Sequence, residues 1–225
     1  LLYLIYNCYD ECMKKLLLLI TILFLTGCNT KEIYYTHNMF YMNTYMYLKL
    51  YNVDKNESEE LFKKVEQIYK EYNNLSDRYK SYDKLINIYY LNNELDVNES
   101  IEIDSKLYDL IEKGIDAYNY TNGKINIALG NVIDVWKSYR DSNAGIPTIK
   151  ELENSGSINI DDIVLENNAY KKLSDIKLDL GAIAKGYATE KAGEMLEDLG
   201  YSNYIINAGG NVKVGSHYNN SKYSI

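Results

Sequence analysis

The chain has 225 residues, a formal net charge of -8, two histidines and three cysteines. An acidic chain of this kind is a poor partner for nucleic acid, because its charge repels phosphate groups. The cysteines are Cys8, Cys12 and Cys28, so the sequence after Cys28 has no disulfide and no thiolate metal site. His37 and His217 are too far apart in the sequence to indicate a zinc cluster.

Residues 13–27 have the pattern of a lipoprotein signal peptide. Lys14 and Lys15 precede an apolar run over 16–25. This run is shorter than the roughly 20 apolar residues that a membrane-spanning helix needs. A buried core helix is the alternative, but the lysines before the run and the Gly-Cys pair after it argue against that alternative. We therefore predict a cleaved signal.

Cys28 closes the sequence Leu25-Thr-Gly-Cys28, which resembles the site where a bacterial lipoprotein is cut before its lipid-modified cysteine. Stable anchoring requires more than one acyl chain on that cysteine. We expect residues 28–38 to be a polar tether, with the protein lipid-anchored at the extracytoplasmic face of the cell membrane. Residues 1–12 are expected to be an upstream extension that is not native to the protein.

Beyond the tether, residues 39–225 are expected to form one α+β domain. Tyrosines and apolar residues alternate over 42–51, which indicates a strand. Apolar residues at helical spacing predict a helix over 57–72, followed by an irregular polar stretch over 75–93. Asp104 is a good N-cap for the next helix, which should stop near Gly123.

The second half of the domain begins with a short predicted helix over 132–137. Thr148 and Glu151 have the spacing of a capping box. Asn167-Asn168 lies between two short apolar segments and indicates a β-hairpin. A helix is expected over 183–199, because its apolar residues continue to a glycine that can terminate it.

The sequence Asp179-Leu-Gly-Ala-Ile-Ala-Lys-Gly-Tyr-Ala188 is the most informative motif. It places a carboxylate, a turn of small residues and Lys185 at the start of a predicted helix. Gly181 and Ala182 allow the backbone to approach a ligand closely, and the lysine can offset phosphate charge. A helix N-terminus beside a cation suits a pyrophosphate. A capped helix with a solvated lysine would fit this spacing equally well.

A second motif, Asn207-Ala-Gly-Gly-Asn211, places the Gly209-Gly210 turn between strands expected over 204–206 and 212–214. Together the two motifs resemble those of the ApbE family of flavin transferases. Three further segments agree in order and spacing: Met42-Asn-Thr44, Leu75 to Asn87, and Thr121 to Gly130. The resemblance implies a single ApbE-like, T-fold-related domain with a mixed or antiparallel sheet and helices.

The resemblance also implies an activity. The family transfers the FMN half of FAD to a threonine of a target flavoprotein, releases AMP and uses Mg²⁺. FAD and an acceptor flavoprotein, of the kind found in redox complexes, are thus the expected partners. Positioning and charge neutralisation dominate such phosphoryl transfer. The alternatives are a non-catalytic flavin-binding lipoprotein, a decayed fragment of such an enzyme, and an unrelated solute-binding lipoprotein.

Site residues follow from the same resemblance. Those expected at FAD are Met42, Tyr79, Lys124, Ile125, Asn126, Asp179, Lys185, Gly209 and Gly210. The Ala182 carbonyl is the expected magnesium ligand. Core packing would equally explain Met42, and the abundance of tyrosine weakens the assignment of Tyr79. Asn43 and Asn126 depart from the glycine and aspartate usual in the family.

The family continues into a segment with a histidine and an acidic stretch that supplies carboxylate ligands to magnesium. We therefore expect a C-terminally incomplete member, with catalytic residues beyond Ile225. One carbonyl is not a magnesium site, because hard cations require several oxygen ligands. The resemblance accordingly implies weak magnesium binding by the residues present.

Overall fold

The computed structural model describes residues 13–15 and 33–217. Residues 1–33 and 34–225 form separate units. Most of the expected signal, Cys28 and the expected extension over 1–12 lie outside the described residues. Within the described ranges, no helix combines the length and apolar character needed to cross a membrane.

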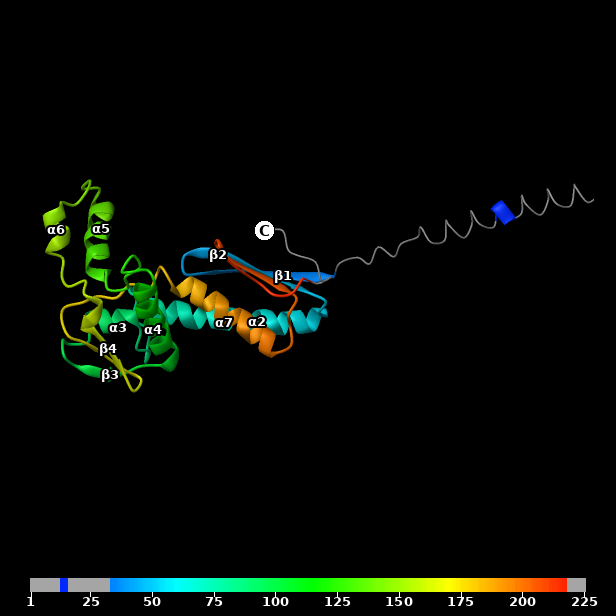
Figure 1. Cartoon of the computed structure of the whole chain (residues 1–225), viewed down its shortest axis with the longest axis horizontal. Helices are drawn as coiled ribbons and strands as arrows, with labels where there is room; N and C mark the ends of the chain where they lie inside the picture. The colour runs from blue at the N-terminus through cyan, green and yellow to red at the C-terminus, as the bar shows by residue number, and fades with distance from the viewer. Residues whose placement is uncertain (1–12, 16–32, 218–225) are drawn as a thin grey trace, which may run out of the picture. The chain divides into compact units, whose positions relative to one another are not determined.

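A four-stranded antiparallel sheet with the order β1-β2-β6-β7 forms one side of the second unit (Figure 1). Its strands are β1 (Tyr34–Tyr41), β2 (Thr44–Tyr51), β6 (Tyr204–Ala208) and β7 (Asn211–Val214). The alternation in β2 is real, since Met46, Leu48 and Leu50 are buried whereas Tyr45 and Tyr47 are exposed. One face of this strand therefore meets the core.

The first hairpin corrects two expectations. The polar tether was expected to reach Asn38, but β1 already begins at Tyr34. Met42 was placed on a strand, but Met42 and Asn43 form the turn between β1 and β2, with φ of 50° and 54°. Asparagine tolerates this left-handed conformation, which explains why Asn43 can stand where the family usually has glycine.

Two long helices pack against this sheet, α2 (Lys55–Ser76) and α7 (Ala184–Asp198), and they run side by side (Figure 1). The Asp54 side chain caps α2 by accepting from the Glu57 N–H. The apolar stripe of α2 is buried along its length, including Leu61, Val65 and Tyr69. This packing confirms the two helices and brings the end of α2 close to the start of α7.

The remaining elements form the other half of the unit (Figure 1). They are α3 (Ile88–Asn93), β3 (Ser100–Glu102), α4 (Ser105–Tyr120), α5 (Gly130–Ser142), α6 (Ile149–Glu153), the 3-10 helix η1 (Ile160–Asp162), β4 (Ile163–Glu166) and β5 (Ala169–Lys172). The three strands pair antiparallel in the order β3-β5-β4. The architecture is thus the α+β arrangement of antiparallel sheets and helices that the resemblance implied.

Local signals in this half are confirmed where they rest on capping and turn chemistry. The Asp104 side chain caps α4, and both hydrogen bonds of the Thr148–Glu151 capping box are present. Asn167 and Asn168 have φ of 52° and 60°, as a two-residue hairpin turn requires. The stretch over 75–93 was expected to be irregular, but it contains α3, which begins at an Asn87 cap.

Candidate functional site

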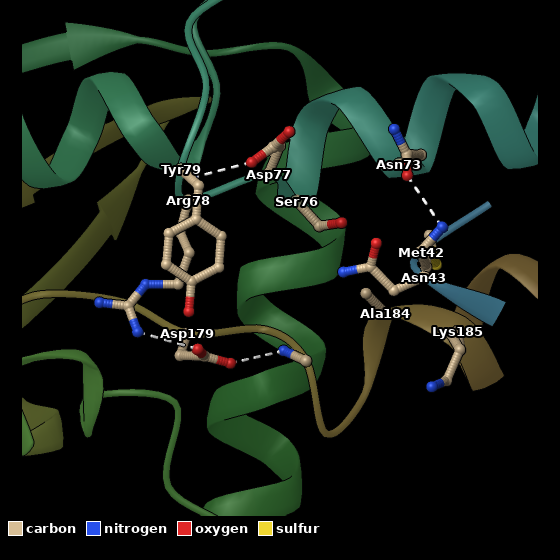
Figure 2. Close-up of a pocket in the computed structure, with 11 residues that line it drawn as sticks. Met42, Asn43, Asn73, Ser76, Asp77, Arg78, Tyr79, Asp179, Ala184 and Lys185 are labelled. Atoms are coloured by element: carbon tan, nitrogen blue, oxygen red, sulfur yellow. Dashed lines mark hydrogen bonds and ion pairs between the residues drawn. The ribbon is translucent and has the colours of Figure 1, made fainter. Parts of the chain in front are cut away.

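A cavity of about 410 Å³ lies between the β1-β2 turn, the end of α2 and the start of α7 (Figure 2). Eleven residues line it: Met42, Asn43, Asn73, Ser76, Asp77, Arg78, Tyr79, Asp179, Gly181, Ala184 and Lys185. The set includes two cations and two carboxylates, together with an exposed aromatic ring. The cavity is therefore polar and charged rather than an apolar core defect.

Arg78 and Asp179 meet at one wall of this cavity (Figure 2). The Arg78 Nη1 donates to the Asp179 Oδ2 at 3.0 Å, and its Nη2 donates to the Asp134 Oδ1 at 2.7 Å. The same Nη2 lies 3.0 Å from the Gly130 carbonyl. Arg78 is only 7% exposed, so its guanidinium is largely removed from water, whereas its carboxylate partners Asp179 and Asp134 stay partly exposed. Lys177 adds a second cation beside Asp134, at 3.1 Å.

The end of α2 orients a neighbouring ring. Asp77 accepts hydrogen bonds from the Tyr79 and Lys80 N–H groups, which fixes the chain as it leaves the helix. The Tyr82 hydroxyl donates to the other Asp77 oxygen, and burial together with that carboxylate raises the pKa of Tyr82. Tyr79 itself is 57% exposed, and Figure 2 shows its ring against the Arg78 side chain.

The opposite wall is the start of α7. Among the described residues, no side chain caps this helix, whose first-turn residues Ala184 and Lys185 line the cavity. The Gly181 N–H donates to the Asp179 Oδ1 at 2.8 Å, so the turn before the helix is tied to the carboxylate. The Lys185 Nζ lies 3.4 Å from the Thr44 Oγ1. An uncapped helix start beside a lysine is suited to a negatively charged group.

The structure brings four of the residues expected at FAD into the cavity lining: Met42, Tyr79, Asp179 and Lys185. The Met42 N–H donates to the Asn73 Oδ1 at 2.9 Å, which fixes the β1-β2 turn against α2. Met42 is half-buried and packs against the core. It therefore contributes both to core packing and to the lining of the cavity. Whether these four residues bind FAD stays a prediction.

The other expected residues lie outside the lining. Gly209 and Gly210 form the β6-β7 turn, with φ of 61° and 102°. A Cβ on Gly209 would fall 2.1 Å from the Thr44 Cγ2, so this glycine makes room for the partner of Lys185. Ala182 is exposed in the turn before α7. None of these three residues lines the cavity.

Lys124, Ile125 and Asn126 lie on the loop before α5 and do not line the cavity. The Asn126 amide donates to the Ile158 carbonyl and accepts from the Ala128 N–H. Asn126 therefore shapes its own loop. That loop is joined to the site by the hydrogen bond from the Asp179 N–H to the Ile127 carbonyl at 2.8 Å.

Five lining residues had no assigned role in the sequence analysis: Asn73, Ser76, Asp77, Arg78 and Ala184. The pairing of Arg78 with Asp179 joins positions 101 residues apart, which no local pattern reveals. Asp77 was recognisable in principle, because an aspartate directly after a helical pattern is suited to bind nearby backbone N–H groups. Asn73 lies within α2 and carries no such signal.

Magnesium does not fit the described residues by themselves. Over 13–15 and 33–217, no group of three His, Cys, Asp or Glu side chains is placed to hold a metal ion. Both Asp179 oxygens are already engaged, one by Arg78 and one by the Gly181 N–H. The Ala182 carbonyl alone falls short of the several oxygens that a hard cation requires.

The α+β fold is shared with solved flavin transferase structures. The Pseudomonas stutzeri flavinyl transferase ApbE, in its apo form, has a TM-score of 0.76 at 17% identity, over 88% of this chain and 64% of that chain. The flavin transferase ApbE from Vibrio cholerae has a TM-score of 0.70 at 18% identity, over 82% and 60%. The ApbE family model matches residues 42–225. The chain belongs to the ApbE family.

Two curated relatives are named FAD:protein FMN transferase. The protein of Haemophilus influenzae is 28% identical over 163 residues, which cover 69% of this chain and 46% of that protein. The protein of Klebsiella pneumoniae is 25% identical over 184 residues, covering 79% and 55%. The chain thus spans about half the length of these relatives. Family membership removes the unrelated solute-binding lipoprotein from consideration.

Proposed function

We propose that this protein is a flavin transferase that binds FAD in the cavity at the start of α7 and passes its FMN half to a flavoprotein. The observation that carries the proposal is that the residues of the family-like motif meet at a single cavity. Asp179 and Lys185 belong to the motif that resembles the family, and they line one cavity with Arg78. The curated relatives that share the family are named for this activity.

Each group has a role that its position supports. Lys185 and the uncapped start of α7 offset the negative charge of a pyrophosphate. The exposed Tyr79 ring offers a stacking surface for an aromatic ring of FAD. In the transfer, an acceptor oxygen forms a bond to the FMN-side phosphorus while the bond from that phosphorus to AMP breaks. The hydroxyl proton passes to a base, and AMP leaves with the bridging oxygen.

A threonine acceptor and a requirement for Mg²⁺ are the finer parts of the proposal, and they rest on the family resemblance. When bound, magnesium would polarise the pyrophosphate and stabilise leaving AMP. The Ala182 carbonyl is the one candidate ligand that the resemblance assigns within the described residues. The residues of the cavity would contribute binding and orientation of FAD.

Transfer is tested directly by mass spectrometry. The full chain is incubated with FAD, Mg²⁺ and a flavoprotein fragment that carries a target threonine. The proposal predicts an FMN mass increment on the fragment, and loss of the increment when the threonine is changed to alanine. FAD binding with no increment would instead favour the second candidate, a non-catalytic flavin-binding protein.

A lipid anchor on Cys28 is the proposed location signal, with the protein held at the extracytoplasmic face of the cell membrane. It rests on the lysines, the apolar run and the Leu25-Thr-Gly-Cys28 sequence. Cys28→Ser should release the protein from the membrane fraction. Thr30→Ser, a change within the tether just after Cys28, is the control and should leave it there. Retention of the Cys28 variant would contradict the anchor.

A further inference from the structure

We propose that Arg78 is a positioning residue that holds two ligand-contacting groups of the cavity, Asp179 and Tyr79, in place at once. The proposal rests on the proposed function, because it assigns Arg78 a role in FAD binding. Arg78 belongs to none of the residues that the family resemblance placed at FAD. Its guanidinium is nevertheless the point where three separate segments of the chain meet, as its contacts show.

The first contact set fixes the guanidinium itself. Its two terminal nitrogens reach Asp179, Asp134 and the Gly130 carbonyl, at 3.0, 2.7 and 3.0 Å. These acceptors come from the loop before α7 and from the first turns of α5. The planar fork of arginine can serve several such acceptors together, whereas the compact ammonium of lysine cannot reproduce that geometry.

The second step runs from Arg78 to the start of α7. Arg78 engages the Asp179 Oδ2, which leaves the Oδ1 to accept the Gly181 N–H at 2.8 Å. Gly181 lines the cavity immediately before the helix that carries Lys185. An unpaired Asp179 could rotate about its side-chain bonds and release this N–H. Arg78 therefore orients the backbone turn through the carboxylate.

The third step runs from Arg78 to Tyr79. The Arg78 Cζ lies 5.3 Å from the centroid of the Tyr79 ring, within the range of a cation–π contact. The Tyr79 N–H donates to the Asp77 Oδ1 at 2.8 Å. The backbone of Tyr79 is thus fixed by Asp77, while Arg78 contacts its ring. The ring remains 57% exposed, which leaves surface for a ligand. Figure 2 shows ring and guanidinium together above Asp179.

The Nε of Arg78 gives independent evidence that the orientation of the guanidinium is set by its carboxylate partners. It is buried and has no hydrogen-bond partner within the described part of the chain. A buried donor without a partner costs free energy, and native structures contain few of them. The guanidinium thus adopts the orientation that Asp179 and Asp134 require, at the expense of its own Nε.

The test compares Arg78→Lys with Lys177→Met in the full chain. Arg78→Lys keeps the charge and removes the fork, so we expect FAD affinity to fall by about tenfold or more. Lys177→Met removes the other cation beside Asp134 without touching Asp179, and we expect a change of less than about twofold. Hydrogen exchange at the Gly181 N–H should become faster in Arg78→Lys only, because Asp179 loses its restraint.

A double-mutant cycle adds the readout that a purely structural role would not move. If Arg78 acts through Asp179, then Arg78→Lys and Asp179→Asn should be strongly non-additive in FAD affinity. Additive losses would overturn the proposal, as would a folded Arg78→Lys protein with unchanged affinity and unchanged Gly181 exchange. Where Arg78→Lys does not fold, Asp134→Asn loosens the same guanidinium, and unchanged Gly181 exchange in that variant would likewise overturn it.

These outcomes separate the positioning role from the function. A wild-type chain that binds no FAD would contradict the proposed function and with it the role of Arg78 in binding. Gly181 exchange would in that case still report whether Arg78 restrains the turn. A wild-type chain that binds FAD, with an Arg78→Lys variant that binds equally well, would contradict the positioning role alone.

Discussion

The hydroxyl groups of Tyr69 on α2 and Thr189 on α7 lie 2.7 Å apart in the core. Thr189 also donates to the Lys185 carbonyl at 2.7 Å, so its single proton is committed and Tyr69 must be the donor of the pair. Burial raises the pKa of Tyr69 to about 12, so that the hydroxyl keeps its proton at neutral pH. The two helices that frame the cavity are thus joined by a buried hydrogen bond one turn below Lys185.

This relationship predicts that Tyr69→Phe lowers the free energy of unfolding by about 1 kcal/mol, because a buried hydrogen bond is lost. Tyr170→Phe is the matched control. The Tyr170 hydroxyl is buried and has no hydrogen-bond partner in the part of the chain that the structure describes. Its removal should be neutral or stabilising. Urea unfolding measures both, and equal losses in the two variants would contradict this account.

Lys185→Ala should weaken FAD binding by about tenfold, because a cation beside the pyrophosphate is removed. Lys191→Ala removes a lysine from the same helix, where it pairs with Glu194 away from the cavity. Calorimetric titration with FAD should therefore show no change for Lys191→Ala. Unchanged affinity in Lys185→Ala would remove this lysine from the site.

Gly209→Ala should destabilise the fold by about 1–3 kcal/mol, because alanine must adopt a left-handed φ and its Cβ meets the Thr44 side chain. Thr44→Ser removes the Cγ2 atom that blocks this Cβ. The double variant should consequently recover part of the loss in a thermal unfolding experiment. A double variant that is less stable than Gly209→Ala would show that the contact with Thr44 is not the cause.

Protonation of Asp162 at low pH should lower the free energy of unfolding. Hydrogen bonds from Ser157 and Ser174 hold the pKa of Asp162 below its usual range. Because the folded pKa lies below the unfolded value of about 3.9, the stabilisation is complete above that value and is lost as the pH falls towards the folded pKa. Asp162→Asn should flatten this part of the curve of unfolding free energy against pH. Asp161→Asn, which makes the same change at an exposed neighbour, is the matched control.

Sequence reasoning succeeded where the determining chemistry is local. The Asp104 cap, the Thr148–Glu151 box and the Asn167-Asn168 turn each depend on residues within a few positions of one another. β1 was missed because its polar residues look like a tether, and only pairing with β2 makes them a strand. The Met42-Asn43 turn was missed for the same reason, since its conformation is visible only once both strands are placed.

The site residues likewise fall into those that a local motif identifies and those that only long-range contacts reveal. Asp179 and Lys185 were identified because one short motif holds both. Arg78 was not, since its significance lies in contacts with Asp134 and Asp179, far along the chain. Lys124 and Asn126 were transferred from the family by position, and the structure places them on a loop beside the site rather than in its lining.

The most direct test of the central claim is an equilibrium titration of the full chain with FAD. The account predicts saturable binding of one FAD per chain, with competition by ADP, because ADP shares the pyrophosphate that the start of α7 and Lys185 would hold. It also predicts that Lys185→Ala weakens both ligands while Lys191→Ala weakens neither. A chain that shows no saturable FAD binding would contradict the assignment of this cavity.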